Sequence, residues 1–463
     1  MSAYFTKQNS SDTVPIFVVP PKGLAAFKKS LQPHLRQWLD SLGFKAKPGS
    51  RALLPAKDGT LAAVITGIAE TPDMWSIAHL PDLVPPGVYH VDTSFHAGLK
   101  AKPESIVPLA IGWGLACYKF DRFVKAAKEW PTLHVPGKYL AEAECMVAAT
   151  HRARDLINSP TNILPPLALA DEVKATGKKY GAKVSVIAGD DLLKKKYPAV
   201  HAVGRASHNP PCMIDLIWGN PSHPKVTLVG KGVCFDSGGL DIKNAANMKL
   251  MKKDMGGAAA MLALAEVIMG EKLPVRLRLM IPAVENSISG DAYRPLDVIN
   301  TRKGLTVEIG DTDAEGRVVL CDPLAEADTE KPDLLIDAAT LTGAARVALG
   351  TDIPAFFTDD DALAGSLYGA SKQTDDPLWR LPMYMPYDDM IASKVADLSN
   401  VADSGYAGAI IGALYLKHFV TQTKSWVHID MMAWNVRNRP GRPVGGEAMA
   451  IRALHQVIRE RYC

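Results

Sequence analysis

The sequence lacks the features that mark several common classes of protein. Its six cysteines are scattered among 463 residues without a CxxC pair, so they form no disulfide framework and suit a reducing compartment. Lysine and arginine (52) nearly balance aspartate and glutamate (49), which gives no support to a nucleic-acid-binding or membrane-surface protein. We therefore expect a cytoplasmic protein with neither a membrane nor a nucleic-acid partner.

Segments that direct secretion or membrane insertion are also missing. The opening stretch, MSAYFTKQNSSDTVPIFVV, has no basic segment followed by an apolar one, so we expect no signal peptide. The longest weakly polar run, residues 256–270, is too short to cross a bilayer and contains Glu266. We expect this run to form a buried helix.

Familiar catalytic signatures are absent as well. The 12 histidines form no HExxH motif, and no GxSxG nucleophile elbow occurs. Gly230-Lys231 lacks the spacing and the following serine or threonine of a P-loop. Any chemistry must therefore come from another arrangement of residues.

The pattern of apolar residues predicts the fold class. Apolar residues make up 47% of the chain and charged residues 22%, which suits a globular protein with a large core. The expected strands after about residue 160 are 184–187, 213–218, 226–229, 277–282, 306–309, 334–336 and 426–431. The expected helices between them include 166–180, 258–269 and 318–328. This alternation predicts an α/β domain with a largely parallel or mixed sheet flanked by helices.

The first part of the chain shows a weaker version of the same pattern. Strands are expected at 15–19, 61–68, 88–91 and 106–111, followed by a helix at 113–130 and a break at 131–137. Residues 139–158 contain no glycine or proline and predict a further helix, which ends at Ser159-Pro160. The expected parts are therefore a smaller N-terminal α/β domain (residues 1–138), a connecting helix (139–160) and a larger catalytic domain (161–463).

Three segments combine charged residues with glycines beside predicted strands or helices: 229–243, 251–257 and 311–317. Ligands of open α/β sheets bind at the carboxyl ends of strands, so these loops could converge there. Crowding their carboxylates without compensation would be strongly unfavourable. Two divalent cations would cancel the charge, and a lysine beside a cation can lose its proton and become a ligand. The alternative is that these carboxylates only cap helices and form surface salt bridges.

The same segments carry a family resemblance. Residues 310–317 match the NTDAEGR hallmark of the leucyl aminopeptidase family, 229–243 match its VGKGxxFDSGGxxxK segment, and 251–257 match its MxxDMGG. Further counterparts lie at 158–162, 337–344, 395–400 and 426–430. Over residues 139–463, the chain thus resembles a family of dizinc or dimanganese exopeptidases.

The resemblance implies a set of metal ligands: Lys231, Asp236, Asp254, Asp313 and Glu315. Asp236 and Glu315 would bridge two divalent ions, either Zn²⁺ or Mn²⁺. Lys231 and Asp254 would complete the more exchange-resistant position, and Asp313 the other.

The resemblance also implies catalytic and substrate-binding residues. Lys243 would polarise the scissile carbonyl, and Arg317 would hold a bicarbonate ion that shuttles a proton to the leaving amine. The backbone carbonyl of Leu341 would contact the substrate. The pocket for the first side chain would be lined by Met251, Thr340 and Gly343. With the peptide's free α-amine on one metal and a metal-bridging water as nucleophile, the implied activity is that of an aminopeptidase.

Two residues depart from the family pattern. Asp311 replaces the asparagine of the hallmark and adds a negative charge near the metals, which could alter metal preference. Met432 replaces a small residue at the rim of the side-chain pocket. A longer, flexible methionine would narrow or reshape that pocket.

The resemblance further implies peptide substrates and a homohexamer that the N-terminal domain helps to assemble. The alternative function is that of a catalytically impaired or nucleic-acid-binding member of the same fold. An activity assay would separate these functions.

Overall fold

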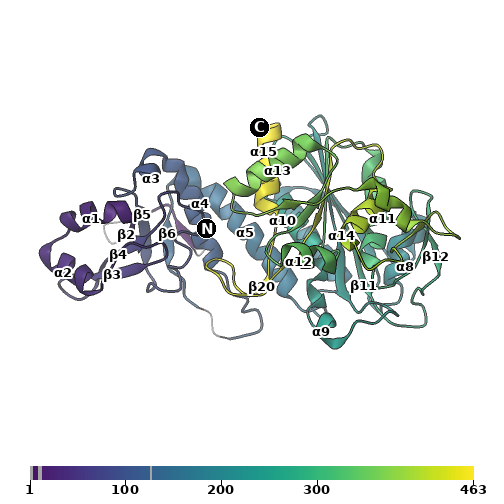
Figure 1. Cartoon of the computed structure of the whole chain (residues 1–463), viewed down its shortest axis with the longest axis horizontal. Coiled ribbons are helices and arrows are strands. Elements are labelled where there is room, and N and C mark those ends of the chain that lie inside the picture. The colour runs from purple at the N-terminus through teal and green to yellow at the C-terminus, as the bar shows by residue number, and fades with distance from the viewer. Residues whose placement is uncertain (1–3, 9–12, 126–127) are drawn as a thin grey trace. The chain divides into compact units, whose positions relative to one another are not determined.

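The computed structural model describes residues 4–8, 13–125 and 128–463 (Figure 1). The chain divides into two compact units. The smaller unit contains Met1–His151 and Arg437–Pro443, and the larger contains Arg152–Val436 and Val444–Cys463. Each unit has its own mixed sheet with helices, which confirms the predicted α/β class.

The smaller unit is built on a six-stranded sheet in the order β1-β6-β5-β2-β4-β3. Its strands are β1 (Phe5–Thr6), β2 (Val14–Val19), β3 (Arg51–Pro55), β4 (Leu61–Gly67), β5 (Val88–Asp92) and β6 (Thr132–His134). Its helices include α1 (Leu24–Ser30), α2 (Pro33–Ser41), α3 (Ala97–Ala101) and α4 (Ile106–Ala116). β3 and β4 pair antiparallel and the other neighbours pair in parallel. An apolar cluster that includes Val19, Phe27 and Leu39 joins α1 and α2 to this sheet.

The structure overturns two predictions in this unit. Residues 106–111, expected as a strand, form the first part of α4. Residues 117–125 and 128–130, expected within a helix, lie outside any helix, and residues 126 and 127 lie outside the described residues. The cause is that α4 is apolar on every side and buried over most of its length, so it shows no helical periodicity. The expected break at 131–137 contains strand β6.

A long helix, α5 (Gly137–Asn158), covers the helix predicted at 139–158. The division between the two units falls within it, between His151 and Arg152. One helix therefore contributes residues to both units.

The larger unit is built on a nine-stranded sheet in the order β16-β15-β18-β14-β9-β11-β8-β7, with β10 paired to β11. The strands are β7 (Lys183–Ala188), β8 (Cys212–Trp218), β9 (Lys225–Gly230), β10 (Gly232–Asp236), β11 (Arg276–Asn286), β14 (Leu334–Ala339), β15 (Ala355–Phe357), β16 (Trp379–Arg380) and β18 (Trp426–Asp430). At its centre β18, β14, β9 and β11 run parallel, whereas β7, β8 and β15 pair antiparallel with their inner neighbours. The sheet is therefore mixed, as predicted.

Short strands form two further sheets in this unit. They are β12 (Val298–Asn300), β13 (Thr306–Glu308) and β17 (Leu398–Ser399) in one sheet, and β19 (Trp434–Asn435) and β20 (Gly445–Gly446) in the other. The strand predicted at 306–309 is β13 and thus belongs to a small sheet.

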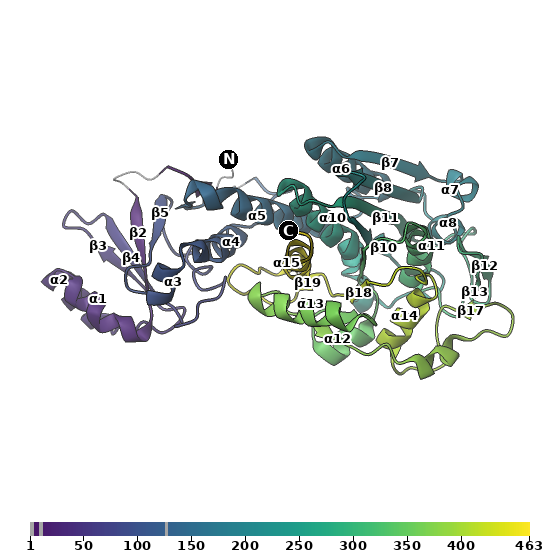
Figure 2. The ribbon, with the colours of Figure 1, turned by 90° about the horizontal axis from the view of Figure 1, so that it is seen from above.

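Helices cover both faces of the large sheet. The helices of this unit include α6 (Pro166–Tyr180), α7 (Asp191–Lys194), α8 (Pro198–Gly204), α9 (Ala245–Met248), α10 (Gly256–Gly270), α11 (Glu315–Thr329), α12 (Gly343–Leu349), α13 (Asp361–Gln373), α14 (Gly408–Lys417) and α15 (Ile451–Tyr462). α6 and α10 pack on one face, and α8 and α11 pack on the other. Figure 2 shows α6 beside β7 and β8.

The run predicted as a buried helix is α10, and its residues are buried from Gly256 to Met269. It contacts β9 and β14 on one side and α15 on another. Among the described residues, no helix has both the length and the apolar character needed to cross a bilayer.

Candidate metal centre

The central parallel strands place several predicted site residues at one edge of the sheet. Lys231 directly follows β9, and Asp236 is the last residue of β10. Thr340 directly follows β14, the parallel neighbour of β9. The carboxyl ends of such strands form the usual ligand-binding edge of an α/β sheet.

Glycines let α10 begin directly against these strands. A Cβ on Gly257 would overlap the carbonyl oxygen of Ala338, and one on Gly230 would lie 2.6 Å from Ala258 Cα. Ala258 N donates a hydrogen bond to Lys231 O at 2.9 Å. Asp254 lies in a 3-10 turn (Met251–Met255) that directly precedes α10. The close packing of α10 therefore brings the Asp254 carboxylate next to Lys231.

The loop before α11 is held by side chains from elsewhere in the chain. Asn400 Oδ1 accepts from Gly310 N (2.7 Å), and its Nδ2 donates to Asp311 O (2.7 Å). Tyr293 Oη donates to Thr312 O (2.7 Å). α11 begins at Glu315, earlier than the start near 318 that the sequence predicts, so this carboxylate is fixed by the helix itself.

All five expected metal ligands and Lys243 meet in one group, which we call the charge cluster. Its members are Lys231, Asp236, Lys243, Asp254, Asp313 and Glu315. Lys231 Nζ lies 2.6 Å from Asp254 Oδ2 and 2.7 Å from Glu315 Oε1. Lys243 Nζ lies 2.8 Å from Asp236 Oδ2 and also donates a hydrogen bond to Asp313 Oδ1. Oxygens of Asp236, Asp313 and Glu315 all lie within 4.8 Å of one another.

Burial sets the electrostatics of the charge cluster. It raises the pKa of Glu315 well above its ordinary value and that of Asp313 to about 7, and in both cases the Asp236 carboxylate adds to the increase. Burial alone would lower the pKa of Lys231, but Asp254, Glu315 and Asp236 raise it. The four carboxylates of the charge cluster thus carry more negative charge than its two lysines can balance.

The donor set of the charge cluster fits divalent cations. Carboxylate oxygens converge with one lysine amine, and the combination suits ions such as Zn²⁺ and Mn²⁺. Gly316 contributes space, because a Cβ there would lie 2.7 Å from Lys231 Nζ.

The charge cluster lines a cavity of about 620 Å³, which we call the cluster cavity. The residues expected to bind substrate line the same cavity: Met251, Thr340, Leu341, Gly343 and Met432. Thr340 Oγ1 donates to Asp254 Oδ1 at 2.7 Å. Asp430 Oδ1 accepts from Leu341 N (3.1 Å) and holds this segment in place.

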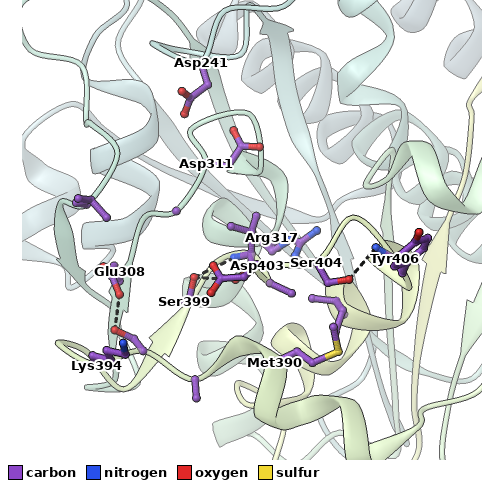
Figure 3. Close-up of a pocket in the computed structure, with 18 residues that line it drawn as sticks. Asp241, Glu308, Asp311, Arg317, Met390, Lys394, Ser399, Asp403, Ser404 and Tyr406 are labelled. Carbon is purple, nitrogen blue, oxygen red and sulfur yellow. Dashed lines mark hydrogen bonds between the residues drawn. The ribbon is translucent and has the colours of Figure 1, made fainter.

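Arg317 and Asp311 lie apart from the cluster cavity. Both line a second cavity of about 830 Å³, whose lining residues are drawn in Figure 3. Arg317 is buried and its Nη1 donates to Asn400 O at 2.8 Å, whereas its Nε makes no hydrogen bond to the described residues. Burial lowers the pKa of this guanidinium. The structure therefore joins Lys243 to the expected metal ligands, whereas Arg317 lines a neighbouring cavity.

Sequence reasoning did not single out several residues of this region. Asn286, Tyr293 and Asn400 orient the carboxylates and the loop before α11, and of these only Asn400 lies in a segment that resembles the family. Lys253 and Arg346 line the cluster cavity. Burial lowers the pKa of Lys253 to about 8.

Comparisons with known proteins match most of this chain. The cytosol aminopeptidase family model for the catalytic domain matches residues 151–455, and the M17 aminopeptidase N-terminal domain model matches residues 14–136. A probable cytosol aminopeptidase of Chlorobium luteolum is 39% identical over 398 residues, which cover 79% of this chain and 78% of that protein.

Solved structures extend the similarity to the whole fold. The crystal structure of a cytosol aminopeptidase from Coxiella burnetii is 44% identical, covers 99% of both chains and superposes with a TM-score of 0.94. The bottromycin maturation enzyme BotP in complex with Mn is 32% identical, covers 98% of this chain and 100% of its own, and gives a TM-score of 0.87.

Proposed function

The chain belongs to the cytosol aminopeptidase family of metallo-exopeptidases, and we propose that it releases N-terminal residues from peptides at the charge cluster. The observation that carries this proposal is the convergence of the charge cluster from three separate segments. Ordinary helix caps and surface ion pairs would not leave Lys231, Asp236, Asp254 and Glu315 buried together.

We propose that the cluster holds two divalent cations. Lys231, Asp236, Asp254, Asp313 and Glu315 would be their ligands. Bound cations would supply a water of lowered pKa and would stabilise the negative charge of the transition state. The relative BotP has been solved in complex with Mn, which supports Mn²⁺ as one such cation.

Each remaining side chain has a separate task in this proposal. Lys243, 2.8 Å from Asp236, would donate a hydrogen bond to the scissile carbonyl oxygen as negative charge develops there. Lys231 would act as a neutral amine and must lose its proton first. The Nε of Arg317 makes no hydrogen bond to the described residues, so this buried guanidinium could hold an anion such as bicarbonate.

We further propose that the protein acts in the cytoplasm as a homohexamer. The support is the resemblance of its motifs to the leucyl aminopeptidase family and the description of its relatives as cytosol aminopeptidases. The nearly balanced charge offers no support for a nucleic-acid-binding role.

The decisive experiment is peptide hydrolysis by the metal-loaded protein. Leucine amide and cysteinylglycine should be cleaved, and chelation, Lys243→Ala or Arg317→Ala should abolish cleavage. Lys249→Ala is the matched control, because Lys249 is exposed and does not line the cluster cavity. Robust turnover after complete removal of metal would contradict the proposal, and metal binding without turnover would favour a catalytically impaired member of the family.

A further inference from the structure

The wall of the cluster cavity contains two cationic residues that the mechanism above does not use, Lys253 and Arg346. Lys253 is 1% exposed, and its Nζ makes no hydrogen bond to any described residue. Its ion pair with a carboxylate is a long one, because Lys253 Nζ lies 4.0 Å from Asp254 Oδ1. Arg346 forms no ion pair within the described part of the chain, and its positive charge adds to the effect of burial in lowering the pKa of Lys253.

The other charges of the cavity are already committed to one another. Asp254 Oδ2 lies 2.6 Å from Lys231 Nζ, and Asp254 Oδ1 accepts from Thr340 Oγ1 at 2.7 Å. Lys243 is shared between Asp236 and Asp313. Lys253 and Arg346 are therefore left without a carboxylate of their own.

These two cations lie where the first side chain of a peptide is expected. Lys253 is in the same short turn as Met251, and a Cβ on Gly343 would lie 3.6 Å from Arg346 Nη2. Met251, Gly343 and Met432 line the cavity with them. The wall around the first side chain thus combines apolar atoms with two positive charges, neither of which donates a hydrogen bond to a carboxylate of the described residues.

A buried cation without a partner costs free energy, and an anionic group of a ligand recovers that cost. We propose that this aminopeptidase prefers peptides whose first residue is aspartate or glutamate, and that Lys253 and Arg346 bind the side-chain carboxylate. This inference rests on the proposed function, since the peptide's α-amine and scissile carbonyl must be held at the charge cluster. A neutral side chain of the same shape would leave the two cations unpaired, and the site would therefore select against it.

The test compares peptides that differ only in the first residue. The metal-loaded protein is given Glu-, Gln-, Asp-, Asn- and Leu-peptides with the same second residue, and kcat/KM is measured at one pH. Hydrogen bonds to a charged group predict that Glu exceeds Gln, or Asp exceeds Asn, by about ten- to a hundredfold. The larger of the two ratios shows which side-chain length the pocket fits.

Variants identify the residues responsible. Lys253→Met and Arg346→Met should each reduce the acid-to-amide ratio by about tenfold or more, mainly through KM, while turnover of the Leu-peptide persists. Lys249→Met is the matched control, because it removes an exposed lysine that does not line the cavity. Arg346 is half-buried, so Arg346→Met should not impair folding. This variant keeps the test informative if Lys253→Met is unstable.

Two results would overturn the inference in distinguishable ways. Cleavage of Leu-peptides with acid-to-amide ratios near one would refute the acidic preference and leave the proposed function standing. Cleavage of no peptide at all would refute the proposed function, and the acidic preference with it.

Discussion

The two units of this chain treat charge differently, although both are α/β structures. Among the described residues of the smaller unit, no aspartate, glutamate, lysine or arginine is buried. The larger unit buries such residues in ion pairs, at helix ends and in the charge cluster. Burial of charged side chains costs free energy. Because the smaller unit forms an α/β structure without buried charged residues, those of the larger unit serve a purpose beyond forming an α/β structure.

Within the larger unit, two groups of buried ion pairs differ in whether their charges balance. Arg154 donates to both carboxylate oxygens of Glu447, at 3.1 and 2.9 Å, and the pair is closed. The charge cluster instead sets four carboxylates against Lys231 and Lys243. Only the open set leaves carboxylates to bind cations.

The largest expected effect comes from removing a carboxylate of the open set. Loss of a group that only supports a metal ligand lowers metal affinity or activity by about tenfold to a hundredfold. Glu315 is itself an expected ligand, so Glu315→Gln should lower kcat/KM by at least about a hundredfold and abolish one Mn²⁺ site. Isothermal titration with Mn²⁺ and a peptide assay measure the two effects. Glu285→Gln is the matched control, since Glu285 is also buried but pairs with Ser207 and Asn209. Unchanged Mn²⁺ binding by Glu315→Gln would erase the distinction between open and closed sets.

Breaking a closed set should affect stability instead of chemistry. Arg154→Met leaves Glu447 buried without its cation and should lower the free energy of unfolding by about 3–5 kcal/mol. Urea denaturation measures the loss. The double variant Arg154→Met with Glu447→Gln should recover part of it, because no uncompensated charge remains. A double variant less stable than the single one would contradict this account.

A core substitution in the smaller unit should separate stability from metal binding. Leu39 is fully buried in the apolar cluster with Phe27, so Leu39→Ala should cost about 2–5 kcal/mol. Hydrogen exchange of α1 and α2 would report the loss, and Mn²⁺ affinity of the folded protein should stay unchanged. A weakened Mn²⁺ affinity would show that the two units are not independent in this respect.

The smallest expected effect is a change in pH dependence. Asp322 in α11 accepts from Ala199 N (2.8 Å) and Arg302 N (2.7 Å), yet burial raises its pKa from 3.8 to about 7. Since the folded state holds this proton more tightly than the unfolded state, its ionisation should lower the free energy of unfolding as pH rises from 3.8 toward 7. The asparagine of Asp322→Asn cannot ionise. The melting temperature of this variant, relative to that of the unmodified protein, should therefore increase as pH rises over this range. Parallel melting curves for both proteins would refute the assignment.

The sequence predicts the centre of the larger unit well because its buried strands are continuous apolar runs. β9, β11, β14 and β18 all lie where such runs occur. The same signal fails for α4, because a helix that is apolar on every side has the same composition as a buried strand. Burial, which separates the two, depends on neighbours distant in the chain.

The candidate site divides in the same way. Its charged members stand in short motifs, so their types and spacing can be read directly. Asn286, Tyr293 and Asn400 act from distant parts of the chain, and of these only Asn400 lies in a segment that resembles the family. Lys253 lies within a recognised motif, but only the fold reveals that its ammonium is buried without a hydrogen bond to the described residues.

Gly316 provides a way to silence the protein without deleting any functional group. An added methyl group would lie 2.7 Å from both Nζ and Cε of Lys231, so the far end of this side chain would have to move away from Asp254 and Glu315. Gly316→Ala would therefore keep every donor of the site while denying one of them its position. Such a protein would be suited to trapping uncleaved peptides for crystallography.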